Sequence, residues 1–140
     1  MKNTLLATTL VATSLLAQPA AAVDFDVRIT NLTNGIYFTP FLAVAHPDGS
    51  ALFEAGQPAS ASLQAMAEGG DIAGLAADVA GLGATVVENP AGGLLAPATS
   101  VTFNMNTDGT TNTLLSAVAM LLPTNDGFAG LNAIDRKSTR

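Results

Sequence analysis

One nearly uninterrupted apolar segment constrains the fold more than any other feature of the sequence. Leu114–Leu122 is apolar except for Ser116. A short run of this kind is typical of a strand that is buried on both faces, so we expect it at the centre of a sheet. A helix over the same residues stays an alternative, because Ala, Leu and Met favour helices. The strand patterns elsewhere in the chain favour the strand.

Several other segments have the patterns of β-strands. Val23–Ile29 alternates strictly, with apolar residues on one face and charged residues on the other, as half-buried antiparallel strands do. An Asp-Gly step within Asn106–Gly109 is typical of a hairpin turn. Further strands are expected at Ile36–His46 (one or two, with Pro40 at a bulge or edge), Ala84–Glu88 and Ser100–Met105.

The middle of the chain has helical composition. Ser60–Ala67 and Asp71–Leu82 are rich in Ala and Leu, and a Gly-Gly pair separates them. Ser60 or Ser62 is expected to cap the first helix, and Asp71 the second. Antiparallel strands interrupted by two short helices predict a mainly β fold, an antiparallel β-sandwich with a helical insertion.

The N-terminal residues have the pattern of a secretory signal peptide. Lys2 is followed by the apolar segment Leu5–Leu16 and by the small residues Ala20–Ala22, which are typical of a cleavage site. We expect residues 1–22 to be removed after Ala22 and the mature chain to be secreted or periplasmic. The apolar segment is too short to span about 30 Å of hydrocarbon as a helix. The rest of the sequence has no second apolar stretch of about 18 residues, so no integral membrane segment is expected after cleavage.

The charge distribution excludes several classes of function. The chain has 5 basic and 11 acidic residues and no cysteine, so it offers neither a basic patch for nucleic acid nor thiolates for disulfides or metals. Residues 23–134 contain one base against ten acids, a net charge of −9. Residues 135–140 hold three of the bases, and we expect a polar tail that is not native to the domain, on a truncated chain. An ordinary basic C-terminal tail stays the alternative. An acidic surface suits an extracellular protein that tolerates salt or attracts calcium.

No motif for catalysis stands out. His46 is the only histidine, which is too few for a zinc site. No G-x-S-x-G, Walker or dinucleotide-binding motif is present, and no catalytic residue is assigned. A secreted hydrolase that uses His46 or carboxylates stays an alternative. Asn31–Thr33 matches a glycosylation sequon, for which a turn is an equally good explanation.

The segment after the long apolar run contains the best candidate for a metal ligand. Asp126, with Asn125 and backbone carbonyls, can provide part of the oxygen shell that calcium requires. An Asp-Gly turn with an Asx hydrogen bond explains the same residues without a metal. From the residues alone, both explanations stay open.

Pro123–Gly130 resembles the loop of spondin-type domains, in which a proline, an aspartate, an aromatic residue and a glycine follow a buried strand. The resemblance spans residues 25–134, so residues 23–134 are expected to form one spondin-like domain. It implies an antiparallel β-sandwich like that of calcium-dependent phospholipid-binding domains, with the helical insertion at about residues 60–82. Further segments that resemble bacterial members are Val27–Thr33, Phe38–Pro40 and Leu52–Ser60.

The resemblance also implies a function. Such a domain is a secreted, non-enzymatic module for calcium-dependent adhesion or for interaction with an extracellular or cell-surface ligand, which the sequence does not identify. Asp126 matches a calcium ligand of the family, and the remaining ligands are expected in a later Asp-Ala-Gly-Thr-type segment beyond the chain end. A periplasmic structural protein is the alternative besides the hydrolase.

Overall fold

The computed structural model describes residues 24–107 and 110–135 of the chain. The expected signal peptide, residues 1–22, lies outside the described residues. Of the expected tail, only Asp135 is described, and it is the last residue of a strand.

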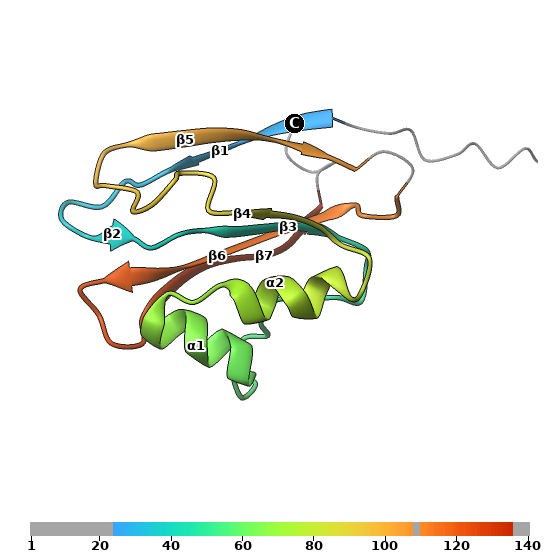
Figure 1. Ribbon diagram of the computed structural model, residues 1–140, viewed down its shortest axis with the longest axis horizontal. Coiled ribbons are helices and arrows are strands. Elements are labelled where there is room, and N and C mark those ends of the chain that lie inside the picture. Colours follow the sequence, from blue (N-terminus) through green and yellow to red (C-terminus); the bar gives the residue numbers. More distant parts are fainter. Residues whose placement is uncertain (1–23, 108–109, 136–140) are drawn as a thin grey trace, which may run out of the picture.

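The described residues form strands and two short helices (Figure 1). The mainly β fold and the helical insertion are confirmed, and both helices lie within the predicted range of residues 60–82. In chain order the elements are β1 (Asp24–Thr30), β2 (Tyr37–Phe38), β3 (Leu42–His46), α1 (Ala61–Gly69), α2 (Ala73–Ala80), β4 (Thr85–Glu88), β5 (Ser100–Asn106), β6 (Leu114–Leu122) and β7 (Phe128–Asp135).

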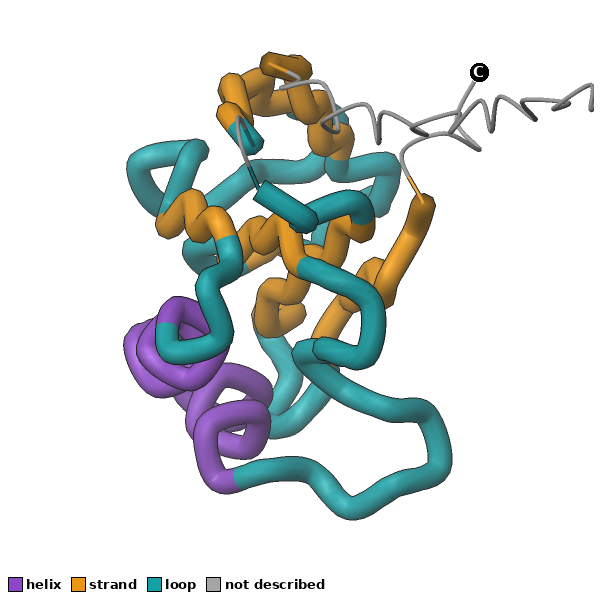
Figure 2. Tube along the Cα trace, turned by 90° about the vertical axis from the view of Figure 1, so that its right-hand side faces the viewer, coloured by secondary structure: helices purple, strands orange, loops and turns teal. Residues whose placement is uncertain are grey.

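Two antiparallel sheets lie face to face. β1 and β5 pair along their whole length, with Asp24 opposite Asn106 and Thr30 opposite Ser100. The larger sheet has the order β2-β6-β3-β4, with β7 also paired to β6. Figure 1 shows β1 and β5 above this sheet and the helices on its opposite side, and Figure 2 shows the helices outside the strands from a second direction. The fold is therefore a sandwich with an additional helical layer.

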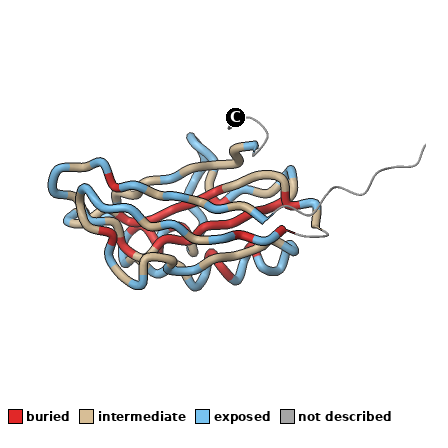
Figure 3. The backbone as a smooth tube through the Cα atoms, turned by 90° about the horizontal axis from the view of Figure 1, so that it is seen from above, coloured by how far each residue is buried: buried red, intermediate tan, exposed pale blue. Residues whose placement is uncertain are grey.

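β6 is the central strand, as its apolar sequence predicts. It pairs with β2 and β3 along one edge and with β7 along the other. Val118 and Met120 pack in the cluster that contains the helices, while Ala117 and Ala119 belong to clusters with residues of β1 and β5. Figure 3 shows the buried positions concentrated in the inner strands. Burial on both faces makes this segment a strand, and the helical alternative is wrong.

Capping fixes the ends of the two helices. Ser60 is the N-cap of α1, and its hydroxyl oxygen accepts a hydrogen bond from Leu63 N at 3.1 Å. Gly70 ends α1 with φ of 70°, a left-handed conformation that glycine adopts without strain. The N-cap of α2 is Ile72, which provides no side-chain cap, so the expectation that Asp71 caps this helix is wrong. Asp71 Oδ1 instead accepts from Ala73 N at 3.0 Å from one residue before the cap position.

Two expectations about connections are wrong. The Asp-Gly step of the expected hairpin falls on residues 108–109, outside the described residues, but the flanking strands do not pair with each other: β5 pairs with β1 in one sheet, and β6 belongs to the other. Phe128–Gly130, placed in the loop by the sequence, is the start of β7. The β6–β7 register shifts between Leu115 and Ala117, and this bulge interrupts the alternation by which a strand is recognised.

Candidate functional site

Asp126 lies at the tip of the loop between β6 and β7. It is exposed, and among the described residues its carboxylate has no hydrogen-bond or ion-pair partner. Thr124 holds the loop instead: its hydroxyl donates to Leu121 O at 2.5 Å and accepts from Gly127 N at 3.1 Å. Leu121 N donates to Gly127 O at 2.8 Å. The turn is therefore present, but threonine forms its hydrogen bonds rather than the expected Asx interaction.

The residues of this loop do not by themselves complete a calcium site. Calcium takes about six to eight oxygen ligands. Asp126 offers one carboxylate and Asn125 one amide, while the carbonyl oxygens of Leu121 and Gly127 already accept hydrogen bonds within the loop. Within residues 24–107 and 110–135, no three His, Cys, Asp or Glu side chains gather in a group suited to a metal ion.

His46 lies far from this loop, at the opposite end of the larger sheet. Its side chain is 1% exposed. Nδ1 is 3.0 Å from Pro47 O, and Nε2 is 2.8 Å from the Ser116 hydroxyl. Because a carbonyl oxygen only accepts, Nδ1 donates to Pro47 O, and Nε2 forms the second hydrogen bond with the Ser116 hydroxyl.

Ser116 connects His46 to the bulge between β6 and β7. Its oxygen accepts from Ala133 N at 2.8 Å, and Asn132 Oδ1 lies 3.3 Å away as a second acceptor for the hydroxyl proton. Asn132 Nδ2 in turn donates to Phe53 O at 2.8 Å. A base and a hydroxyl are in contact here, but Ser116 is 0% exposed and no substrate reaches it. This burial favours a structural role for the pair, so the structure adds no support for His46 as the base of a hydrolase.

The structure decides between the two explanations of the sequon. Asn31 is fully buried, and its Nδ2 donates to Ile36 O at 2.8 Å and Leu95 O at 3.0 Å. Its Oδ1 accepts from Thr33 N at 3.0 Å and from the Thr33 hydroxyl at 2.7 Å. Both donor hydrogens and both acceptor positions of the amide are used. Asn31 therefore organises the turn, and a glycan on Nδ2 would break the bonds that hold it.

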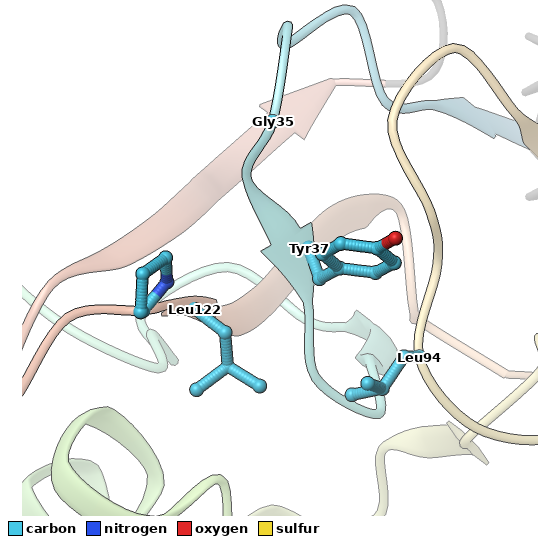
Figure 4. A pocket seen from close by; sticks show the side chains of 5 residues that line it. Gly35, Tyr37, Leu94 and Leu122 are labelled. Carbon is cyan, nitrogen blue, oxygen red and sulfur yellow. The ribbon is translucent and has the colours of Figure 1, made fainter.

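An apolar groove lies beside this turn (Figure 4). Its volume is about 390 Å³, and its lining residues are Gly35, Tyr37, Leu94, Leu122 and Pro123. Tyr37 is 43% and Leu94 54% exposed, and Leu32, in the same turn as Gly35, is 88% exposed. Leu82, after α2, is the other large apolar residue exposed among the described residues.

The groove and Asp126 occupy one end of the sandwich. Figure 1 shows the turn after β1 and the loop after β6 at the same side of the molecule. We call residues 31–37, Leu94 and residues 122–127 the loop end. A second, smaller groove of about 270 Å³ contacts β1 and β7 and includes Arg28 and Leu131; neither groove is lined by His46 or Ser116.

Sequence reasoning missed the apolar part of the loop end. Leu32 and Leu94 each stand in a turn-like segment rich in Gly and Asn, where an apolar residue has no strand periodicity to explain it. The absence of strand periodicity around these two leucines was the sequence signal that could have indicated exposed apolar residues. The groove itself joins residues from three separate segments, and their proximity follows only from the pairing of β2 with β6 and the Phe38–Leu95 bridge.

Replacing Ser116 tests the structural role of the buried histidine pair. Ser116→Ala leaves Ala133 N–H and His46 Nε2 without their partner in a buried place, so the free energy of unfolding should fall by about 2 kcal/mol. Urea unfolding measures this loss. Ser100→Ala removes an exposed hydroxyl that also bonds across strands and should cost much less. Equal stability of Ser116→Ala and the unaltered protein would contradict the assignment.

Comparison with known proteins adds one match. The family model described as Spondin_N matches residues 28–136. The match includes the loop end, Asp126 and the His46–Ser116 pair. No curated protein sequence matches the chain.

Proposed function

The chain belongs to the Spondin_N family, and we propose that it is a recognition module that contacts a protein partner through the loop end. Domains of this family are extracellular, non-catalytic modules. The observation that supports a contact role for the loop end is its apolar groove, which is lined by the exposed side chains of Tyr37 and Leu94.

Exposed apolar side chains beside a groove favour an interaction role. Single exposed apolar side chains are common, but a contiguous group around a concave surface is typical of contact sites. The backbone beneath it is held by the buried Asn31 amide and by Thr124. Because these segments are already ordered, a partner would lose little conformational entropy in binding them.

The charge of the module favours a basic partner. The described residues include one base, Arg28, against ten acids, a net charge of −9. Such a field attracts a surface with Lys or Arg around an apolar centre and speeds its association. It repels a membrane of anionic lipids. A basic protein segment with apolar side chains therefore suits the loop end.

A model peptide tests the proposed contact surface. The probe is a fluorescent peptide of alternating Leu and Lys, and its affinity is measured by anisotropy. Leu94→Ser and Tyr37→Ser should each weaken binding by about tenfold, the effect of removing one well-placed apolar contact. The matched control is Leu82→Ser, which removes an equally exposed leucine away from the loop end.

Three results would each argue against one part of this proposal: the location of the contact surface, the role of charge and the protein partner. The first is equal weakening by Leu82→Ser. The second is equal affinity for a Leu-Glu peptide, which would remove the role of charge. The third is binding to phosphatidylserine vesicles without calcium, which would favour a lipid partner.

Calcium-dependent adhesion is a second proposal, supported by Asp126, which is exposed and has no partner among the described residues. With one carboxylate and one amide in the loop, calcium held there needs oxygen ligands from elsewhere, such as a bound partner. The mature chain alone should therefore bind calcium with a dissociation constant above about 1 mM, the weak limit for extracellular calcium modules.

Calorimetric titration of calcium into the purified chain measures this affinity. Asp126→Asn should remove whatever heat is observed, while Asp48→Asn, an exposed aspartate in another turn, should leave it unchanged. Micromolar binding would contradict the expected weak affinity, and binding that survives Asp126→Asn would show that the loop is not the site.

Export through the expected signal peptide completes the proposal. Neither helix in the described part of the chain is long and apolar enough to cross a membrane. We propose cleavage after Ala22 and release of the domain outside the cytoplasm. N-terminal sequencing of the exported protein should begin at Val23, and recovery of the uncleaved chain in the cytoplasm would contradict it.

A further inference from the structure

The turn that borders the apolar groove contains an Asn-Gly step, Asn34–Gly35. Both residues are exposed, and in the described structure neither makes a hydrogen bond. Gly35 has φ of +140°, and no atom lies within 4 Å of the position that a Cβ would occupy. Gly35 therefore has no side chain and no packed neighbour there to hinder the approach of its nitrogen to the side-chain carbonyl carbon of Asn34.

The two described Asp-Gly steps differ from this Asn-Gly step. At Asp126–Gly127, the glycine nitrogen donates to Thr124 Oγ1 at 3.1 Å, and that oxygen lies 2.8 Å from the position of a Gly127 Cβ. At Asp48–Gly49, the glycine nitrogen donates to Asp48 Oδ1 at 3.0 Å. Both steps also have a carboxylate where Asn34 has an amide. Ring closure at a carboxylate would have to expel hydroxide, which is a much poorer leaving group than the ammonia that an amide releases.

The remaining asparagines lack the combination found at Asn34. Asn31 and Asn112 are buried and hydrogen-bonded through their side-chain amides. Asn125 is exposed, but an aspartate follows it, and a side chain at that position hinders ring closure. Among the described asparagines, only Asn34 precedes a glycine.

We propose that Asn34 is a site of spontaneous deamidation. The deprotonated backbone nitrogen of Gly35 attacks the side-chain carbonyl carbon of Asn34, and a new C–N bond closes a five-membered succinimide ring. The bond to the side-chain nitrogen breaks, and ammonia leaves with the proton. Water then opens the ring at either carbonyl and yields aspartate or isoaspartate at position 34. One water enters and one ammonia leaves, with no oxidation or reduction.

The modification changes the loop end in two ways. Each event places a carboxylate on the turn whose Gly35 lines the groove, so the local charge becomes more negative. The isoaspartate product also inserts a methylene group into the main chain just before Gly35. Ile36 O, one residue further, accepts from the buried Asn31 amide, so the longer main chain alters the position of that acceptor. This inference does not depend on the identity of the partner.

Incubation of the folded, mature chain at mildly alkaline pH tests the proposal. Acidic species are separated by ion exchange, and peptide mapping by mass spectrometry locates the residue in which –OH has replaced –NH₂. Conversion at Asn34 should be at least about tenfold faster than at any other described asparagine, because none of the others is followed by the conformationally free glycine. Asn34→Gln should abolish the main acidic species.

Asn125→Gln is the matched control, since it alters an equally exposed asparagine at the same end of the molecule and should leave the acidic species unchanged. Asn34→Asp provides the chromatographic position of the aspartate product. The proposal is wrong if no acidic species accumulates, if the species persists in Asn34→Gln, or if the modified residue maps to another asparagine.

Discussion

The buried amide of Asn31 holds together the end of the sandwich that carries the exposed apolar residues. Its side chain bonds Ile36 O, Leu95 O and Thr33, while its backbone bonds Thr99 O at 2.9 Å and Ala98 N at 2.8 Å. An amide left unpaired in a buried place costs about 1–3 kcal/mol, so the turn after β1 and the segment before β5 are ordered together. Tyr37 and Leu94 lie beside these bonds, and the shape of the groove therefore depends on Asn31.

The rest of the molecule supplies a rigid frame for this end. β6 is packed on both faces, and the buried His46–Ser116 pair fixes its bulge at the opposite end. Thr124 closes the loop that presents Asp126. Contact residues on loops held by a rigid sheet are a common arrangement for recognition. Within this ordered turn, Asn34 and Gly35 are exposed and make no hydrogen bond in the described structure, which is why we propose deamidation at this step.

Local patterns predicted most of the fold but little of the site. β1, β5, β6 and both helices follow from periodicity and from caps such as Ser60, which act within a few residues. β7 was not predicted because its bulge interrupts the alternation of apolar and polar residues. The Asp-Gly step before β6 indicates a turn but does not indicate which sheet the next strand joins. The groove and the Asn31 bonds connect residues about sixty positions apart, so only the assembled sheets bring them together.

Amide hydrogen exchange in Asn31→Ala tests most directly whether this one buried side chain orders the loop end. Phe38 N, Leu95 N and Ala98 N donate backbone hydrogen bonds at 3.1, 2.9 and 2.8 Å in the segments that Asn31 joins. We predict faster exchange at these three amides, with the central β6 amides of Val118 and Ala119 unchanged relative to the unaltered protein. Unchanged exchange at Phe38 and Leu95 would contradict the central role of Asn31.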